Sequence, residues 1–345
     1  MYPRNQWYCA ALGHELKDAP VGRIFLDEPV VMYRKADGAI VALEDRCCHR
    51  RAPLSKGKVE GSNIRCGYHG FLYDATGQVI WVPGQDKVPP DAKVKSYPIV
   101  EKHGYVWIWM GDPSLADPKD APAFTWNDDP QWASFSDYMH VDANYLLLVD
   151  NLLDLSHVAV LHIQTIGSAE DTNPDLDWER GPNWVRGTRI GRNLSPSARQ
   201  KAEGVDFNCD QVKIMDFTPP ANVVIDILSS ETGYKFGEGG RLNNRLFVLD
   251  SMTPETGRSC HYFFGLCRNY KIDNTQMTEF MAKAVVTAFL EDKDMLEAEQ
   301  KIIDLDPDHA QIDVMGDTGG LQARRIVERL IAEEARPGSN RAAAE

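Results

Sequence analysis

The chain has 345 residues, a length that suggests about two domains. Hydrophobic residues make up 43% and charged residues 26%, which is typical of a folded globular protein and excludes a disordered or collagen-like chain. The net charge of −14 would repel the phosphates of nucleic acids and anionic membranes, so we expect neither as a partner. The same charge predicts that a partner protein docks through basic residues.

Targeting signals are not visible in the sequence. No apolar run approaches the roughly 18 to 20 residues of a membrane-spanning helix, and the first residues do not follow a signal-peptide pattern. The seven cysteines are an odd number in a long chain, which argues against a disulfide framework and leaves free thiols or metal ligands. We therefore expect a cytoplasmic protein.

The first part of the chain has the pattern of an all-β domain. Short extended runs at 30–33, 79–82 and 105–109 are separated by turn residues. The segment 111–130 then contains four prolines and five aspartates, which interrupt both strands and helices. We place the domain boundary in this segment and assign residues 1–115 to the first domain.

The second domain, 116–336, is predicted to be α+β. Hydrophobic periodicity predicts helical structure at 142–162, followed by longer strands of an antiparallel sheet and two C-terminal helices. The predicted strands are 212–217, 221–228, 245–252 and 260–268, and the predicted helices are 278–304 and 320–335. Residues 337–345 have little to bury and are predicted to form a flexible tail.

Two mixed pairs of metal-ligand residues occur in the first domain, Cys47-x-His49 and Cys66-x-x-His69. Two thiolates and two imidazoles suit either a tetrahedral structural zinc or a [2Fe–2S] cluster whose irons take two cysteines and two histidines respectively. Zinc modules usually pair like ligands, whereas each pair here contains one of each type, so the spacing favours the cluster. Cys48 lies outside the pattern, as does Cys9, and we interpret both as buried small hydrophobes.

The two pairs, with the glycines and tyrosine around the second pair, resemble the motif of the Rieske non-haem iron oxygenases. The family usually has proline before the first histidine, where this chain has Cys48. The resemblance implies that the [2Fe–2S] cluster is held by Cys47, His49, Cys66 and His69. It also implies a Rieske domain followed by a helix-grip, START-like catalytic domain.

A second group of polar residues interrupts an apolar segment of the second domain: Asp150, Asn151, Asp154, His157 and His162. Charges buried without a partner would be costly. Two imidazoles and one carboxylate form the facial triad that binds Fe(II) and leaves positions open for O₂ and substrate, although the histidines alone would equally suit satisfied core positions. The two histidines are separated by about 140° around an ideal helix, so we expect an irregular turn between them.

The carboxylate of such a triad has two candidates. Asp154 is closer in sequence, but Asp292 lies on the buried stripe of the predicted C-terminal helix. That stripe also contains Met281, Val285, Phe289 and Leu296. From the residues alone, Asp292 could be a metal ligand or the partner of a basic group.

Neighbouring polar residues are interpreted from the same periodicity. Glu291, Lys293 and Asp294 fall off the stripe and are predicted to face solvent. Asn151 and Asp150 flank Asp154 and would either support the iron site through it or have surface or helix-capping roles. Asp250, near a predicted strand, would disfavour an anionic substrate if it pointed into the pocket.

The family resemblance extends to this region, because Asp-x₃-Asp-x₂-His-x₄-His matches the family's iron motif and the family takes its carboxylate from a late helix. It implies that mononuclear Fe(II) is bound by His157, His162 and Asp292. It also implies that Asp154 joins this iron to His69 of a neighbouring subunit, in a ring of subunits that would be a homotrimer.

Within the family, the length and the segments 105–113 and 319–325 are similar to the oxygenase components of vanillate and dicamba O-demethylases. This implies electrons from NADH, delivered by a flavin and [2Fe–2S] reductase or a ferredoxin, and O₂ as co-substrate. The methyl carbon of an aryl ether would be hydroxylated, and the hemiacetal would collapse to a phenol and formaldehyde.

A methoxybenzoate is the first expected substrate, and N-dealkylation or hydroxylation of another small aromatic compound is the alternative. A pure electron-transfer Rieske protein would leave the second iron motif unexplained, and a zinc-stabilised binding module fits the ligand spacing less well.

Overall fold

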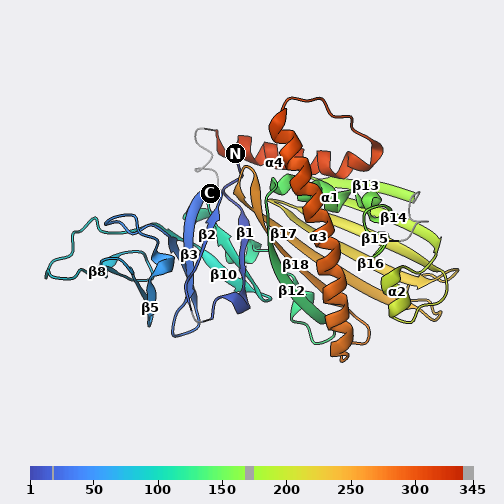
Figure 1. Cartoon of the computed structure of the whole chain (residues 1–345), viewed down its shortest axis with the longest axis horizontal. Helices are drawn as coiled ribbons and strands as arrows, with labels where there is room; N and C mark the ends of the chain where they lie inside the picture. Colours follow the sequence, from blue (N-terminus) through green and yellow to red (C-terminus); the bar gives the residue numbers. More distant parts are fainter. Residues whose placement is uncertain (18, 168–174, 337–345) are drawn as a thin grey trace, which may run out of the picture. The chain divides into compact units, whose positions relative to one another are not determined.

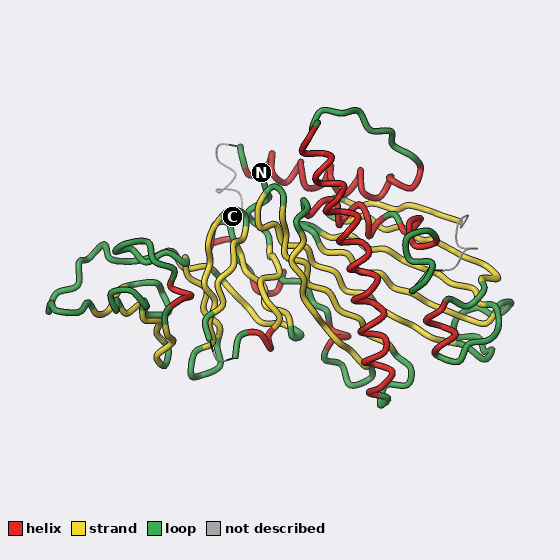
Figure 2. The backbone as a smooth tube through the Cα atoms, in the orientation of Figure 1, coloured by secondary structure: helices red, strands yellow, loops and turns green. Residues whose placement is uncertain are grey.

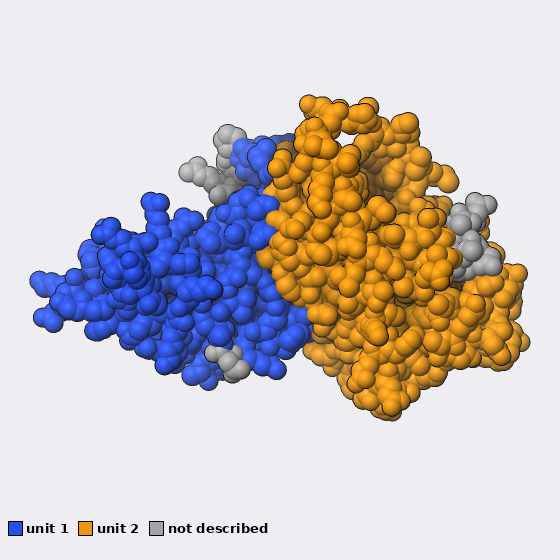
Figure 3. Space-filling model, in the orientation of Figure 1, with its two compact units in different colours: residues 1–123, 253–256, 333–345 blue, residues 124–252, 257–332 orange. Residues whose placement is uncertain are grey.

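Short strands fill the N-terminal part of the chain, as the spacing of its turn residues predicts (Figure 2). The computed structural model describes residues 1–17, 19–167 and 175–336, so the predicted tail at 337–345 lies outside the described residues. Two compact units are distinguished in Figure 3: unit 1 comprises residues 1–123, 253–256 and the described residues from 333, and unit 2 comprises 124–252 and 257–332.

Unit 1 contains three small sheets, ordered β1-β11-β10, β2-β3-β4-β9 and β5-β6-β7-β8. Glycines with positive φ at the turns keep the strands short, as at Gly38 (φ 89°) and Gly77 (φ 86°). The strands are β1 (Trp7–Leu12), β2 (Val21–Phe25), β3 (Glu28–Arg34), β4 (Ile40–Glu44), β5 (Lys58–Glu60), β6 (Asn63–Arg65), β7 (Leu72–Tyr73), β8 (Val79–Trp81), β9 (Ser96–Tyr97), β10 (Ile99–Lys102) and β11 (Tyr105–Trp109).

Apolar side chains between these sheets form two buried clusters. The second cluster includes Leu54, Ile64 and Tyr73, together with Cys47 and Cys66. The two cysteines of the metal-ligand pairs are therefore anchored in the core of the sheet that carries them, and the loop after β4 and the loop between β6 and β7 start from fixed positions.

Unit 2 is built on one antiparallel sheet of seven strands, ordered β12-β18-β17-β16-β15-β14-β13. The sequence predicts the last four strands but not the first three. The strands are β12 (Ala133–Val141), β13 (Asp175–Gly181), β14 (Trp184–Leu194), β15 (Cys209–Thr218), β16 (Asn222–Glu231), β17 (Asn243–Thr256) and β18 (Ser259–Arg268).

Helices cover one face of this sheet (Figure 1), which gives the α+β, helix-grip architecture that the family resemblance implies. The helices are α1 (Tyr145–Leu153), α2 (Ala198–Ala202), α3 (Thr275–Leu305) and α4 (Thr318–Glu334), with a short 3₁₀ helix η6 (Leu155–Ala159) after α1. Asn144 and Asn274 begin α1 and α3, because their side chains accept hydrogen bonds from the first-turn amides of Leu146 and Met277 (both 2.9 Å).

The position of the two histidines follows from how α1 ends. The helix stops at Leu153, Asp154 is extended, and η6 carries His157 before the chain turns again towards His162. The irregular turn predicted between the two histidines is confirmed, and the α-helix ends four residues before the first of them. None of the helices in the described ranges is long and apolar enough to cross a bilayer.

Candidate active site

The two Cys/His loops of unit 1 have the same backbone structure. In the first loop, the Cys47 carbonyl accepts a hydrogen bond from the Arg51 amide (2.8 Å), and the Cys47 amide donates one to the Ala52 carbonyl (2.9 Å). In the second loop, the Cys66 carbonyl accepts from the Gly70 amide (3.1 Å), and the Cys66 amide donates to the Phe71 carbonyl (2.8 Å). The residue that closes each loop has a left-handed backbone conformation, with φ 60° at Arg51 and 77° at Gly70. The two pairs are therefore presented by equivalent turns, although their spacings differ by one residue.

Each loop buries its thiol and exposes its imidazole. Cys47 and Cys66 are 3% and 2% exposed, whereas His49 and His69 are at the surface with ring centroids 4.6 Å apart. Phe71 stacks on His49 at 4.9 Å, which holds that ring in place. Two inner thiols and two outer imidazoles match the donor set of a cluster in which one iron lies towards the core and the other towards solvent.

Protonation favours neutral imidazole at the surface. Partial desolvation, followed by the charges of His69 and Arg50, lowers the pKa of His49 below its usual value. Burial, followed by contacts with Cys47, raises the pKa of the Cys66 thiol. Metal binding would therefore displace thiol protons but would not have to compete for a proton on His49 at neutral pH.

Tyr73 supports the first loop from β7. Its hydroxyl donates to the Cys47 sulfur (3.0 Å) and accepts the Cys48 amide (3.1 Å). Cys48 itself is exposed, so its interpretation as a buried hydrophobe is wrong: the turn that buries Cys47 directs the next side chain outward. Cys9 is fully buried, as expected.

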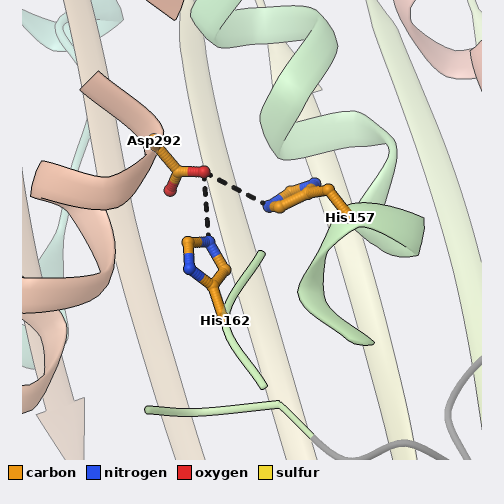
Figure 4. A group of neighbouring side chains, drawn as sticks. All are labelled: His157, His162 and Asp292. Atoms are coloured by element: carbon orange, nitrogen blue, oxygen red, sulfur yellow. Dashed lines mark hydrogen bonds and ion pairs between the residues drawn. The ribbon is translucent and has the colours of Figure 1, made fainter. Parts of the chain in front are cut away.

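The second site lies in unit 2, where the structure brings His157, His162 and Asp292 together (Figure 4). The Nε2 atoms of His157 and His162 lie 3.5 Å and 3.1 Å from the same Asp292 oxygen, Oδ1. One ligand atom from each residue lies within 4.8 Å of the others, and His162 and Asp292 are buried. Two imidazoles and one carboxylate that converge in this way can hold one divalent transition metal.

Each imidazole of this group is oriented through its other nitrogen. His157 Nδ1 donates to the backbone carbonyl of Asp154 (2.7 Å), and His162 Nδ1 to the Glu291 carboxylate (2.6 Å). Thr165 Oγ1 donates to the same Glu291 oxygen (3.2 Å). Because each Nδ1 carries the proton that it donates, the Nε2 of each neutral imidazole is free of a proton and can bind a metal. Hydrogen bonds of this kind fix the tautomer of histidines that bind metals.

Glu291 was missed by the helical periodicity, which predicts a solvent-facing side chain. Its position next to Asp292 turns it away from the apolar stripe, but its long side chain reaches the chain segment after η6 and is only 30% exposed. Lys293 is also half-buried and donates to the His140 carbonyl (2.8 Å), whereas Asp294 is exposed as expected. The sequence pattern does not show that the segment containing His162 lies beside α3, and this placement is what brings Glu291 into contact with it.

The two histidines differ in their affinity for protons. Burial lowers the pKa of His157, against the opposing charge of Asp292. Burial also acts to lower the pKa of His162, but hydrogen bonds and charges from Asp292 and Glu291 outweigh it and the pKa rises. Without a metal, His162 is therefore the histidine that holds a proton between the two carboxylates.

The remaining predicted residues have distinct positions around the group. Asn151 on α1 donates from Nδ2 to Asp292 Oδ1 (3.0 Å), so it positions the carboxylate. The Asp154 carboxylate accepts the Ser156 amide (2.9 Å) at the start of η6. Asp150 pairs with Arg324 of α4, with Nε to Oδ2 at 3.0 Å, and so ties α4 to α1.

An apolar cavity of about 100 Å³ lies beside the three residues, between the helices and the sheet. Its volume is of the order of the roughly 150 Å³ cavity that takes up benzene. Apolar lining residues come from both sides: Leu152, Leu155, Val158, Val285 and Phe289 from the helices, and Ile225, Ile227, Leu246, Val248 and Leu266 from the strands. The cavity therefore offers a mostly apolar surface next to the metal-binding group, of the kind that binds aromatic rings.

Asp250 does not line this cavity, although it is completely buried. Its Oδ1 accepts a hydrogen bond from the Tyr262 hydroxyl (2.7 Å), and its Oδ2 has no partner among the described residues. Burial raises its pKa to about 8, so it is mostly protonated at neutral pH. It therefore does not present the negative charge that would disfavour an anionic substrate.

A chain that holds a Cys₂His₂ loop pair on one unit and a two-histidine, one-carboxylate group beside an apolar cavity on the other has the two metal sites of a Rieske non-haem iron oxygenase. Family comparison agrees with this class. Residues 6–98 match the Rieske [2Fe-2S] domain, and residues 141–333 match the vanillate O-demethylase oxygenase C-terminal domain. The chain therefore belongs to the Rieske oxygenases with this type of catalytic domain, and its cofactors are a Rieske [2Fe–2S] cluster and non-haem iron.

Individual relatives cover nearly the whole chain. A putative toluene-4-sulfonate monooxygenase iron–sulfur subunit of Comamonas testosteroni is 40% identical over 97% of this chain and 98% of its own length. The vanillate O-demethylase oxygenase subunit of a Pseudomonas species is 34% identical over 97% and 96%. The crystal structure of dicamba monooxygenase bound to 3,6-dichlorosalicylic acid matches with a TM-score of 0.90, at 32% identity over 97% of this chain and 99% of that chain.

Proposed function

We propose that the chain is the oxygenase component of a monooxygenase that O-demethylates a small methoxylated aromatic compound such as vanillate. The observation that carries this proposal is the convergence of His157, His162 and Asp292 on one wall of a mostly apolar cavity of about 100 Å³. The relatives add the chemistry, because two of them are named as O-demethylases of aromatic compounds. In the balanced reaction, O₂, NADH and a proton convert the aryl methyl ether to a phenol, formaldehyde, NAD⁺ and water.

The proposed cluster ligands are Cys47, His49, Cys66 and His69. Their support is the matched pair of loops, which bury both sulfurs and expose both imidazoles. A bound cluster of this kind stores one electron at a time for the mononuclear site. Exposed histidines give a redox partner direct access to the cluster edge.

The proposed ligands of mononuclear Fe(II) are His157, His162 and Asp292, and this iron, when bound, supplies the activation of O₂. The chain's own residues hold the geometry. Glu291 retains the proton at Nδ1 of His162, and Asn151 restrains the Asp292 carboxylate. The apolar lining excludes water and positions the methoxy carbon towards the two Nε2 atoms.

The electron path is proposed to cross between subunits of a homotrimer, from the cluster at His69 of one subunit to the iron site at Asp154 of the next. Asp154 is suited to this position because its backbone carbonyl already holds His157 (2.7 Å). A hydrogen-bonded connection of this kind would orient both imidazoles and shorten the path. The proposed location is the cytoplasm, where the cysteines that do not bind the cluster would stay reduced.

The partner that reduces the cluster is proposed to be a flavin and [2Fe–2S] reductase or a ferredoxin. Although the chain carries a net charge of −14, the exposed side chains around the first loop are basic: Arg46, Arg50, Arg51, Lys56 and Lys58. The local charge at this loop therefore favours an acidic docking surface on the partner, whereas the net charge of the whole chain favours a basic one.

The test of this function is aerobic turnover of methoxybenzoates with NADH and a surrogate reductase, with formaldehyde assayed against NADH consumed. Formaldehyde in a near 1:1 ratio to NADH from at least one compound would support O-demethylation. NADH consumption that yields only peroxide with every methoxybenzoate would contradict it.

A second function, hydroxylation of an aryl methyl group, is favoured by one observation. Two relatives at 40% and 39% identity, over 97% of the chain each, are named as toluene-4-sulfonate monooxygenase subunits. The same assay distinguishes this function, because a benzylic alcohol would form from toluene-4-sulfonate without release of formaldehyde.

A further inference from the structure

The hydroxyl of Tyr73 connects the first Cys/His loop to the residue that follows its cysteine. Tyr73 ends β7 and is completely buried, so its hydroxyl is shielded from bulk water. The hydroxyl oxygen lies 3.0 Å from the Cys47 sulfur, 3.2 Å from the Cys48 sulfur and 3.1 Å from the Cys48 amide nitrogen. Cys48 therefore contacts the hydroxyl with both its amide and its thiol, although the residue as a whole is exposed.

The directions of these hydrogen bonds follow from the number of protons. A phenolic hydroxyl carries one proton and two lone pairs. Tyr73 donates its proton to the Cys47 sulfur, which as a cluster ligand is a thiolate and a strong acceptor. The Cys48 amide can only donate, and it uses one lone pair of the hydroxyl oxygen. The Cys48 thiol must then donate to the second lone pair, because Tyr73 has no further proton to give to that sulfur.

The two loops differ at the residue that follows the cysteine. In the second loop this residue is Gly67, where a Cβ atom would lie 2.6 Å from the Lys56 carbonyl oxygen, closer than packed atoms approach. In the first loop the same position holds a side chain that can donate a hydrogen bond. Hydrogen bonds in a buried chain strengthen one another, so two donors from Cys48 make Tyr73 a stronger donor to Cys47.

We propose that Cys48 is a positioning residue that raises the reduction potential of the cluster through Tyr73. By donating from its amide and its thiol, Cys48 keeps the single hydroxyl proton directed to the Cys47 sulfur. When the cluster accepts one electron from the reductase, this proton stays on Tyr73 and stabilises the added negative charge, which raises the potential. The inference goes beyond the proposed function and rests only on the proposed cluster ligands.

The experiment is a redox titration of the enzyme with its cluster bound, followed by visible absorption in the absence of substrate. Tyr73→Phe removes the donor to Cys47 and should lower the equilibrium constant for cluster reduction by about 10-fold, or about 59 mV for one electron. Cys48→Ala removes only a weak S–H donor and should lower it by about 3-fold. Cys48→Ser keeps a donor and should restore most of that loss. Ser62→Ala, on the exposed turn between β5 and β6, is the matched control and should not change the potential.

A double variant tests whether Cys48 acts through Tyr73. Because phenylalanine has no hydroxyl to orient, adding Cys48→Ala to Tyr73→Phe should change the equilibrium constant by less than about 1.5-fold. The proposal is wrong if Cys48→Ala has the potential of the unmodified enzyme, or lowers the potential equally with and without the Tyr73 hydroxyl. Cys48 is exposed, so its variants should fold and bind the cluster even where Tyr73→Phe does not. The alanine and serine variants then decide the question alone.

The potential is measured without substrate and without turnover. A shift that depends on Cys48 in an enzyme that forms no formaldehyde would therefore leave this inference intact and refute only the proposed function. An unmodified protein that shows no Rieske spectrum would instead overturn the assignment of Cys47 as a cluster ligand, and this inference with it.

Discussion

The two metal-binding regions of this protein are constructed in opposite ways. In unit 1, all four proposed cluster ligands lie between residues 47 and 69, in two loops with the same backbone hydrogen bonds, and the imidazoles are exposed. In unit 2, the donors come from η6, the turn after it and α3, and His162 and Asp292 are buried. Local turns are sufficient for the first region, whereas the second exists only when α3 packs on the sheet.

The largest effect is expected from Asp292→Ala, which should affect the iron site of unit 2 and leave the cluster loops of unit 1 unchanged. Asp292→Ala should remove the mononuclear iron and lower turnover by a factor of about 10³ or more, because the metal supplies several kcal/mol of the catalysis. The cluster loops should be unaffected, so visible absorption of the cluster should stay at the level of the unmodified protein. Metal analysis, absorption spectra and steady-state rates check this.

The control is Asp294→Ala, on an exposed position of the same helix. It should keep both metals and full activity. Loss of the cluster absorption in Asp292→Ala would contradict the independence of the two regions.

The first region is built from local turns and the second from distant segments, and this difference decides how much of each region the sequence predicts. Both Cys/His pairs could be proposed as cluster ligands from their spacing, since the turns that build them are local. Asp292 could be located because it lies on a helical stripe with Met281 and Phe289, but Glu291 could not, because its partner His162 is brought to α3 only by the fold. The sequence likewise could not show that Lys213 lines the cavity, since that depends on which face of β15 is inward.

Strands of the catalytic sheet show the same limit. The apolar segments that became β15 to β18 were predicted, with β17 extending further at both ends than expected. β14 was missed because glycines and arginines alternate with its few apolar residues, so that its half-buried face carries little hydrophobic signal. The prediction of α+β was still confirmed, because four strands and two long helices were enough to define it.

A smaller effect is expected from the contact that supports His162. Glu291→Ala should weaken Fe(II) binding by about 10-fold to 100-fold, as for loss of other partners of ligand histidines. Glu291→Gln keeps an acceptor oxygen for Nδ1 and should recover much of the affinity. Iron titration of the apoprotein measures both, and equal affinity in all three proteins would show that the contact does not position His162.

Asp250 gives a prediction for stability within the buried region. Its pKa of about 8 in the fold lies above the ordinary 3.8, so the folded state binds this proton more tightly than the unfolded state. Its burial therefore costs little below pH 4, and the cost grows as the pH rises towards 8. Asp250→Asn should raise the free energy of unfolding by about 2–4 kcal/mol at pH 7, with a smaller gain at pH 5.

Urea unfolding at pH 5 and pH 7 checks this, with Asp294→Asn as the exposed control. A gain that is the same at pH 5 and pH 7 would mean that Asp250 is ionised in the fold.

The smallest effect concerns the exposed region. Because Arg46, Arg50 and Arg51 surround the first cluster loop, turnover supported by an acidic reductase should fall several-fold between low and high ionic strength. Substituting Arg50 and Arg51 by serine should flatten this salt dependence without changing iron content. A turnover rate that does not depend on salt concentration would show that the reductase does not dock at this loop through charge.

The central claim, that the exposed cluster serves the buried iron, is tested most directly by a single turnover without reductase. Enzyme with its cluster reduced in advance is mixed with O₂ and 4-methoxybenzoate or toluene-4-sulfonate, and cluster reoxidation and oxidised product are measured together. We predict that the cluster is reoxidised as product forms, and that Asp292→Ala keeps its cluster reduced and forms no product. Product formation by Asp292→Ala at the rate of the unmodified enzyme would contradict the claim.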